Sequence, residues 1–136
     1  MKRIEYLSLF ANLFRFKSIY DKNGNEYIIF DDNSLDSIDD IVDRTAFEAY
    51  ENHVHLLNYV SAEDYLQCTP IARSIGNALL CSLQASYPGK SFIVYVSIRK
   101  RDSMIIRFHQ KWENETPYYN PECFISDQEQ VIRIES

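Results

Sequence analysis

Two runs of alternating apolar and polar residues, separated by a short basic segment, constrain the fold of this chain more than any other feature. The runs cover residues 92–99 and 104–109, and every second side chain in each run is apolar. Successive residues of a β-strand point to opposite faces of a sheet, so this period of two predicts two strands. A three-residue loop keeps the apolar side chains on one face, whereas a two-residue loop would place Arg107 and His109 among them. The sequence therefore predicts an antiparallel hairpin near residues 91–111, with Ile98 opposite Met104, Val96 opposite Ile106 and Val94 opposite Phe108.

The second face of this predicted hairpin is mixed in character. It carries Tyr95 opposite Arg107 and Ile93 opposite His109. An arginine and a histidine on one strand face can hold an anion, although stacking on Tyr95 explains Arg107 equally well. A deep pocket lined by Tyr95, Arg107 and His109 would indicate a small-ligand-binding module or an enzyme, whereas a covered face would argue against both.

A second hairpin is predicted near residues 15–31. Asn23-Gly24 lies between two apolar runs, and this dipeptide favours a type I′ turn, in which both central residues have positive φ. The same segment has some features of a calcium-binding loop. Glu26 stands where such a loop needs glycine, and Asp32 stands where it needs the longer glutamate, so we favour the hairpin.

Apolar residues at helical spacing predict helices in four segments. They cover residues 6–13, 34–43, 45–60 and a segment that begins with Thr69 as N-cap and Pro70 as first helical residue and ends near Ser86. The last helix is apolar nearly all round, which predicts a buried central helix with Cys81 in the core. With a C-terminal strand at 131–134, the sequence predicts a single α+β domain spanning residues 1–136. Its antiparallel sheet, formed by the two hairpins and that strand, packs against two or three helices.

The predicted helix at 45–60 contains two of the three histidines. It places Glu48, Glu51, Asn52 and His55 on its polar face and His53 at the border of its apolar face, as a packed histidine. Residues two apart on a helix point in different directions. The His-x-His spacing can therefore bind a metal only if this segment is a strand.

Composition excludes several classes of function. The net charge of −6 argues against general binding to nucleic acid or to anionic membranes, which requires excess positive charge. Three cysteines without a C-x-x-C motif favour reduced thiols, and no apolar run is long enough to span a membrane, so a cytoplasmic protein is predicted. The sequence has no glycine-rich phosphate loop and no catalytic motif, and we predict neither an enzyme nor a bound cofactor or metal.

The predicted helix at 34–43 would carry a stripe of carboxylates. Four aspartates fall on one face, opposite an apolar face made of Leu35, Ile38, Ile41 and Val42, and they are Asp36, Asp39, Asp40 and Asp43. Residues 31–51 contain eight acidic residues and a single basic one, Arg44. Such a stripe is either a solvated helix face or an anionic surface for a cationic partner.

A second candidate surface follows the 91–111 hairpin. Residues 112–124 have no clear period and are predicted to form a loop that is rich in aromatic and acidic side chains, including Trp112, Glu113, Glu115, Tyr118 and Tyr119. Long loops on a rigid scaffold often carry function, and this composition suits an interface with a basic protein. The loop can equally fold down over the edge of the sheet.

In its acidic tract at 31–51 and its block M-I-I-R-F-H-Q-K-W-E-N-E-T-P-Y-Y at 104–119, the chain resembles the immunity proteins of bacterial toxin–immunity systems, including contact-dependent growth inhibition. The resemblance implies a small acidic inhibitor that binds a cognate toxin domain, here a basic, nuclease-like one. Either of the two surfaces would carry the binding: the stripe of Asp36, Asp39, Asp40 and Asp43, or the loop with Trp112, Glu113, Glu115, Tyr118 and Tyr119. A structural subunit of a larger assembly is a third hypothesis, which an exposed apolar patch would support.

Overall fold

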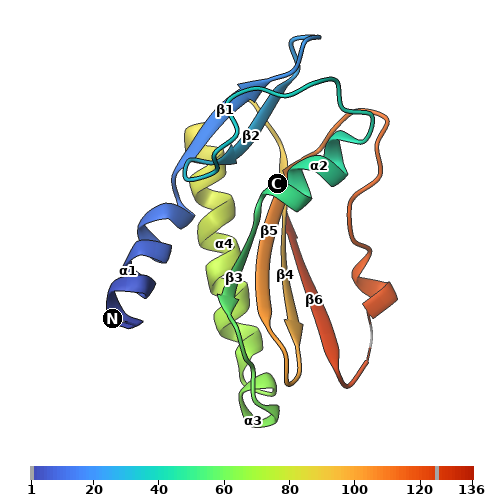
Figure 1. The fold of residues 1–136 in the computed structure, drawn as a ribbon. Coiled ribbons are helices and arrows are strands. Elements are labelled where there is room, and N and C mark those ends of the chain that lie inside the picture. The colour runs from blue at the N-terminus through green and yellow to red at the C-terminus, as the bar shows by residue number, and fades with distance from the viewer. Residues whose placement is uncertain (1, 125) are drawn as a thin grey trace.

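The computed structural model describes residues 2–124 and 126–136 and shows an α+β fold built on two antiparallel sheets (Figure 1). The strands are β1 (Phe16–Tyr20), β2 (Glu26–Phe30), β3 (His53–Leu57), β4 (Phe92–Arg99), β5 (Met104–Gln110) and β6 (Glu129–Glu135). The helices are α1 (Lys2–Leu13), α2 (Arg44–Glu51), α3 (Ala62–Tyr65), α4 (Cys68–Ser86) and the 3-10 helix η1 (Pro121–Phe124). The larger sheet has the order β3-β5-β4-β6, and β1 and β2 form the smaller sheet. The predicted fold class is confirmed, with the two hairpins in separate sheets.

The β4–β5 hairpin forms the centre of the larger sheet, and its predicted register is confirmed. Ile98 pairs with Met104 and Val94 with Phe108, around a three-residue loop in which Arg101 has a φ of 60°. The C-terminal strand is also confirmed, because β6 pairs with the outer side of β4. These pairings place one alternating set of side chains from all three strands on a single face, where they contribute eight of the eighteen described buried residues of the main core.

Helix α4 covers the apolar face of the larger sheet. It approaches β6 closely at Gly76, where an added Cβ would lie 2.6 Å from the Ile134 side chain. The prediction that α4 is buried all round is wrong, since Ile71 is 61% exposed and Cys81 is exposed. The helix forms an outer layer, and only the side that meets the sheet is buried. The helix begins at Cys68, so Thr69 is not its N-cap as predicted, and the Thr69 hydroxyl donates to Gln130 on β6.

The predicted long helix at 45–60 is wrong in its second half. Helix α2 ends at Glu51, and the chain then forms strand β3 at an edge of the larger sheet, paired with β5. The side chain of Asn52 accepts from Phe30 N at 3.2 Å and donates to Ile28 O at 2.9 Å, which ties the end of the helix to β2. Alternation in this segment fits a strand as well as a helix, and pairing with β5 decides between them. His53 is exposed on this strand, not packed as predicted.

The predicted helix at 34–43 is absent, because these residues form an irregular segment that crosses the β1–β2 sheet. Its apolar side chains, Leu35, Ile38 and Ile41, pack on a small second core made of Ile19, Tyr27 and Ile29. Asp43 is the N-cap of α2, and its carboxylate accepts from Ala46 N at 2.9 Å. A helix would have aligned four like charges, whereas the extended path separates them and still buries the apolar residues.

The predicted hairpin at 15–31 is confirmed, but its turn differs from the prediction. Tyr20 pairs with Glu26, and residues 21–25 connect the two strands. Arg101 and Asn114 are the non-glycine residues with positive φ in the described part of the chain, so Asn23 lacks the positive φ that a type I′ turn requires. The Asp21 carboxylate organises the loop instead. It accepts from the backbone N of residues 23 and 25, at 2.9 and 3.0 Å, and from the Tyr27 hydroxyl. The Asn25 side chain also donates to it, at 2.9 Å, and this bond is the first cause of the lowered pKa of Asp21, which the other bonds reinforce.

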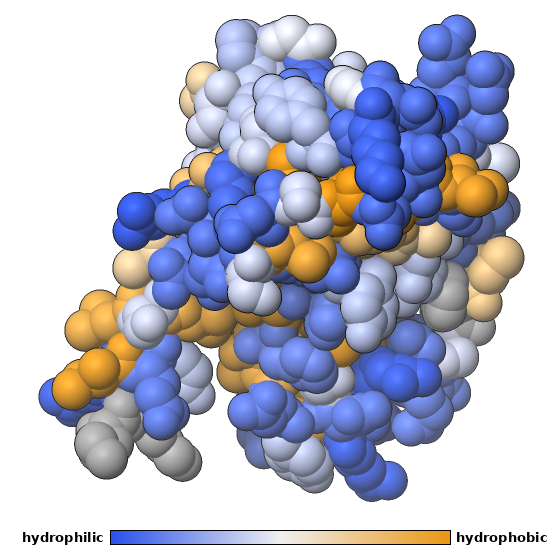
Figure 2. Space-filling view, turned by 45° about the horizontal axis from the view of Figure 1, so that its top comes forward, coloured by the Kyte–Doolittle hydropathy of each residue, from blue (hydrophilic) through white to orange (hydrophobic). Residues whose placement is uncertain are grey.

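Helix α1, which the sequence predicted, projects from the body of the molecule at one end (Figure 1). Leu13 is buried, but Ile4, Tyr6, Leu7 and Phe10 are exposed. Figure 2 shows apolar side chains gathered on this projecting end. No helix in the described residues combines the length and apolar character needed to cross a membrane.

Candidate functional site

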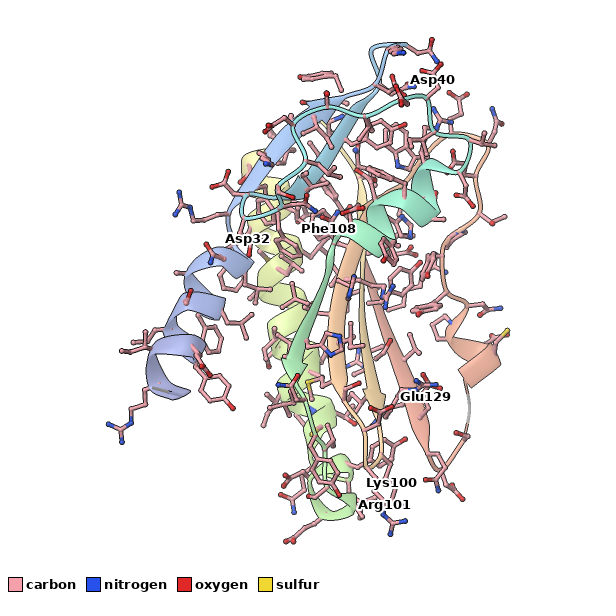
Figure 3. All side chains as sticks on the ribbon, viewed as in Figure 1. Asp32, Asp40, Lys100, Arg101, Phe108 and Glu129 are labelled. Carbon is pink, nitrogen blue, oxygen red and sulfur yellow. The ribbon has the colours of Figure 1, made fainter. Side chains whose placement is uncertain are left out.

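The acidic segment, residues 31–43, presents its carboxylates to solvent. Asp31, Asp32, Asp36, Asp39, Asp40 and Asp43 are all exposed. Figure 3 shows Asp32 and Asp40 near opposite ends of the segment. Two ion pairs offset part of this charge: Arg15 lies 3.5 Å from Asp31 and Lys22 lies 3.4 Å from Asp39. Both pairs are largely exposed, so solvent screens them and the segment remains an anionic surface.

The acidic segment is held in place from beneath, although it lacks regular secondary structure. Leu35, Ile38 and Ile41 are half-buried against the second core, so the chain points apolar side chains inward and aspartates outward. Asn33 fixes the start of the segment, because its side chain accepts from Leu35 N and donates to Glu51 on α2. A fully buried apolar side chain contributes about 1.5–3 kcal/mol, so each of these half-buried ones contributes roughly half of that, which orders the segment before any partner arrives.

Trp112, predicted as an exposed anchor for a partner, is half-buried and engaged inside the molecule. Its indole N–H donates to Glu48 Oε1 at 2.7 Å, and its ring lies 5.1 Å from the Tyr27 ring. The Arg44 guanidinium lies 4.8 Å above the ring. Trp112 therefore joins the second core to the loop that follows β5, which is a structural role.

Glu115 is also engaged internally, at the start of α2. Its carboxylate accepts from Thr45 N at 2.7 Å and from Arg44 Nε at 2.8 Å, so the loop at 112–120 caps the first turn of the helix. Burial raises the pKa of Glu115, but the bonds from Thr45 and Arg44 outweigh it and hold the pKa below its usual value. Glu113, by contrast, is exposed.

Replacing Glu115 with alanine is expected to lower the free energy of unfolding by about 1–2 kcal/mol, the usual cost of losing a helix N-cap. The backbone N–H groups of Arg44 and Thr45, which donate to Glu115 at 3.3 and 2.7 Å, lose their acceptor, and Arg44 loses its ion pair. Urea unfolding measures the change. Glu113→Ala, two residues away and exposed, is the matched control and should change stability by less than about 0.5 kcal/mol. Equal effects of the two variants would contradict the capping role.

The Tyr95, Arg107 and His109 face is covered by the loop at 112–120. The Arg107 guanidinium lies 5.3 Å from the ring centre of Tyr118 and 5.3 Å from that of Tyr119. Tyr95 and His109 are buried, with exposed fractions of 0% and 1%. The cleft beside this face is lined by His109 but by neither Tyr95 nor Arg107.

His109 fastens the loop to the sheet as a neutral imidazole. Its Nδ1 faces Gln110 O at 2.7 Å, and a carbonyl can only accept, so Nδ1 carries the proton. Nε2 then accepts from the Tyr95 hydroxyl at 3.0 Å and from Tyr118 N at 3.3 Å. Burial lowers the pKa of His109, which keeps the ring in this state near neutral pH.

Glu48, which the sequence prediction placed on a solvated helix face, is fully buried and joins both sheets. Its carboxylate accepts from Ile28 N at 2.9 Å, Gln110 N at 2.8 Å, Gln110 Nε2 at 2.8 Å and Trp112 Nε1 at 2.7 Å. Burial raises its pKa to about 7, against the opposing effect of these four donors. The buried side of α2 comprises Thr45, Glu48, Ala49 and the capping residue Asn52. Three of these four residues are polar, so a search for apolar residues at helical spacing does not find the buried side.

Comparison with known proteins places the chain in one family. Residues 8–136 match the family described as "Uncharacterized protein PM0498 family". The chain belongs to this family. Neither a curated protein nor a solved structure matches it significantly.

In this member of the PM0498 family, a cleft of about 300 Å³ lies between the loop at 112–120 and the sheet, lined in part by Trp112 and Arg133. Its basic groups are already paired, since Lys111 and Arg133 both contact Glu135, at 3.6 and 2.8 Å. Across the described residues, no three His, Cys, Asp or Glu side chains are close enough together to hold a metal ion.

Proposed function

We propose that this chain is a protein-binding inhibitor with a basic partner, acting in the cytoplasm as an immunity protein that neutralises a cognate, nuclease-like bacterial toxin. The observation that carries the proposal is the acidic segment, whose aspartates face outward from an ordered backbone. Opposite charge accelerates association and selects a cationic partner, such as the nucleic-acid-binding face of a nuclease.

Order in the acidic segment favours tight binding. Leu35, Ile38 and Ile41 already fix the backbone in the free protein, so little conformational entropy is lost when a partner binds. Among the described residues, Asp36 and Asp40 form no ion pair, and Asp39 forms a single exposed one, with Lys22. Arginine side chains of a partner can pair with these carboxylates in a bidentate manner.

The proposed interface also has apolar anchors, but they differ from those predicted. Tyr20 is 53% exposed and lies beside Asp39 in a shallow hollow of about 290 Å³. Val42, at the far end of the acidic segment, is 99% exposed. Binding energy in protein interfaces concentrates in a few apolar or aromatic residues surrounded by polar ones. Tyr20 is therefore the proposed aromatic anchor, in place of Trp112, Tyr118 and Tyr119.

The experiment identifies a toxin-like gene next to the gene of this chain and measures binding to its product. Reversing three charges, in Asp36→Lys/Asp39→Lys/Asp40→Lys, is expected to slow association by about tenfold or more at low salt, because steering is lost. Stopped-flow or surface plasmon resonance gives the rate constants, repeated across a range of ionic strength.

A matched control reverses three exposed acids on other elements, Glu5→Lys/Glu63→Lys/Glu122→Lys, and changes the net charge by the same amount. This control should retain most of the association rate, since its charges lie outside the acidic segment. Equal losses in both triple variants would assign the effect to net charge alone. Absence of a complex with the wild-type chain would refute the proposal.

Helix α1 supports a second candidate function, that of a subunit in a larger assembly. Ile4, Leu7 and Phe10 are between 51% and 69% exposed on one projecting helix, which is unusual for a surface that meets only water. Light scattering after size exclusion distinguishes the two functions. An assembly that Leu7→Glu dissociates would favour the subunit, and a monomer at micromolar concentration would favour the inhibitor.

A further inference from the structure

A pair of histidines on the edge strand β3 forms a surface group that the proposed inhibitor function does not use. His53 and His55 are two residues apart, both are exposed, and their ring centres lie 5.9 Å apart. Side chains two apart on a strand share a face, so the strand brings together two rings that a helix would have separated. Because β3 is at the edge of the sheet, solvent reaches both rings.

The hydrogen bond at His53 prepares its ring to bind a metal ion. His53 Nδ1 contacts the backbone carbonyl of Tyr50, and since a carbonyl can only accept, Nδ1 carries the proton. Nε2 therefore has a free lone pair. Histidines that ligate metals usually donate their other ring N–H to a carbonyl or carboxylate, which fixes both the tautomer and the ring orientation.

The spacing of the rings is close to what a shared metal ion requires. With metal–nitrogen distances near 2.0–2.1 Å and a tetrahedral angle, two ligating imidazoles have ring centres about 5 Å apart. Small side-chain rotations bring the two rings from the observed separation of 5.9 Å to this spacing. We propose that His53 and His55 chelate a divalent transition-metal ion, of the class of Zn²⁺, Ni²⁺ or Cu²⁺, through their Nε2 atoms.

The residues around His53 and His55 determine how many ligands the protein gives the metal ion. No third His, Cys, Asp or Glu of the described residues completes a metal cluster here, so the ion keeps positions open for water or for a partner's side chain. A hollow of about 410 Å³ beside His55, also lined by Glu5 and Tyr6, gives room for these ligands. Imidazole nitrogen selects Zn²⁺, Ni²⁺ and Cu²⁺ over Mg²⁺ and Ca²⁺, which prefer oxygen.

The third histidine does not compete for the ion. Both ring nitrogens of His109 are engaged inside the protein, so it has no free lone pair. Cys81 and Cys123 are exposed thiols and could bind these metals. The experiment therefore uses the full chain both as wild type and with Cys81→Ser/Cys123→Ser.

The test titrates ZnCl₂, NiCl₂ and CuCl₂ into the full chain, followed by calorimetry and by NMR of the imidazole nitrogens. We expect one ion per chain, tightest for Cu²⁺, with the Nε2 resonance of His53 perturbed and its Nδ1 still protonated. His53→Ala and His55→Ala should each weaken binding by at least about tenfold, and MgCl₂ should not bind. Binding should weaken in acid, because protons compete with the metal for the imidazole nitrogens.

The control His55→Ala/Asn58→His keeps the number of histidines but not their spacing, and it should bind as weakly as His55→Ala. Thermal unfolding without metal shows that each variant is folded. Unchanged binding in His53→Ala/His55→Ala would overturn the proposal, and so would ligation through Nδ1 of His53. None of these outcomes depends on a toxin partner, so they are distinct from those of the inhibitor test.

Discussion

Replacing Glu48 with alanine is expected to lower the free energy of unfolding by about 3–5 kcal/mol, a large part of the stability of a typical domain. The variant leaves the four donors of Glu48 without an acceptor in a site that water does not reach. Each buried donor left unpaired costs about 1–3 kcal/mol before the structure relaxes. Urea unfolding followed by circular dichroism measures the difference.

Glu51→Ala, on the same helix, is the matched control. Glu51 accepts one hydrogen bond, from the Asn33 side chain at 2.9 Å, and is only half-buried, so the control should cost less than about 1 kcal/mol. The loss in Glu48→Ala should also release the Trp112 indole, which near-ultraviolet circular dichroism and fluorescence report. Similar losses in the two variants would mean that Glu48 does not join the sheets.

Glu48 also gives the protein a pH dependence of definite sign. The folded pKa of about 7 lies above the value of 4.5 for an unperturbed glutamate, so the folded state binds the proton more tightly. The contribution of Glu48 is therefore present below about pH 4.5 and is lost as the pH rises towards 7, by an amount on the order of 2–3 kcal/mol. His109 acts in the opposite direction, because its lowered pKa gives stability that is lost as the pH falls below about 6.5.

Comparison with Glu48→Gln separates the two contributions, since His109 is present in both proteins. Relative to this variant, the wild type should lose stability between pH 5 and pH 7.5. Below pH 4.5 both proteins should lose stability together, because the lowered pKa values of Glu26, Glu115 and Glu135 act in both. A wild type that gains stability relative to Glu48→Gln over pH 5 to 7.5 would contradict the assignment.

The sequence predicted best where one pattern fitted one structure. The register of β4 and β5 follows from side-chain alternation, because a slip by one residue would move Val94 and Phe108 to the wrong face. The segment at 53–57 fits two patterns, and the choice came from pairing with β5 and from the bonds of Asn52 to β2. Those partners are distant in the sequence, and no local pattern contains them.

The candidate site was predicted in part. The exposed aspartates follow from composition, since carboxylates without partners stay in water. The path of their backbone does not, because Leu35, Ile38 and Ile41 have helical spacing but pack against the β1–β2 sheet. The same rule, that an acidic side chain is usually solvated, predicts the exposure of the aspartates correctly and that of Glu48 wrongly. The four donors that make burial of Glu48 possible come from three other segments, which no local pattern contains.

Replacing Phe108 with alanine is expected to lower the free energy of unfolding by about 3–5 kcal/mol, because the substitution leaves a cavity where the two sheets meet. Phe108, on β5 of the larger sheet, is fully buried, and Figure 3 shows it between the sheets. Its ring centre lies 5.0 Å from that of Phe30 and 5.7 Å from that of Phe16, both on the smaller sheet. On its own sheet it packs edge to face against Phe92, at 6.2 Å. Urea unfolding gives the total loss, and amide hydrogen exchange shows where it acts.

The position of Phe108 makes this loss uneven across the fold. In Phe108→Ala, amides of β1 and β2 should exchange faster than those of β4, because the smaller sheet has only two strands and relies on packing against the larger one. Phe10→Ala, on α1, removes an equal side chain that is 51% exposed and should cost less than about 1 kcal/mol. Uniform faster exchange over both sheets would mean that they unfold as one unit. The acidic segment packs on the smaller sheet, so loosening β1 and β2 should also slow partner binding without any change in charge.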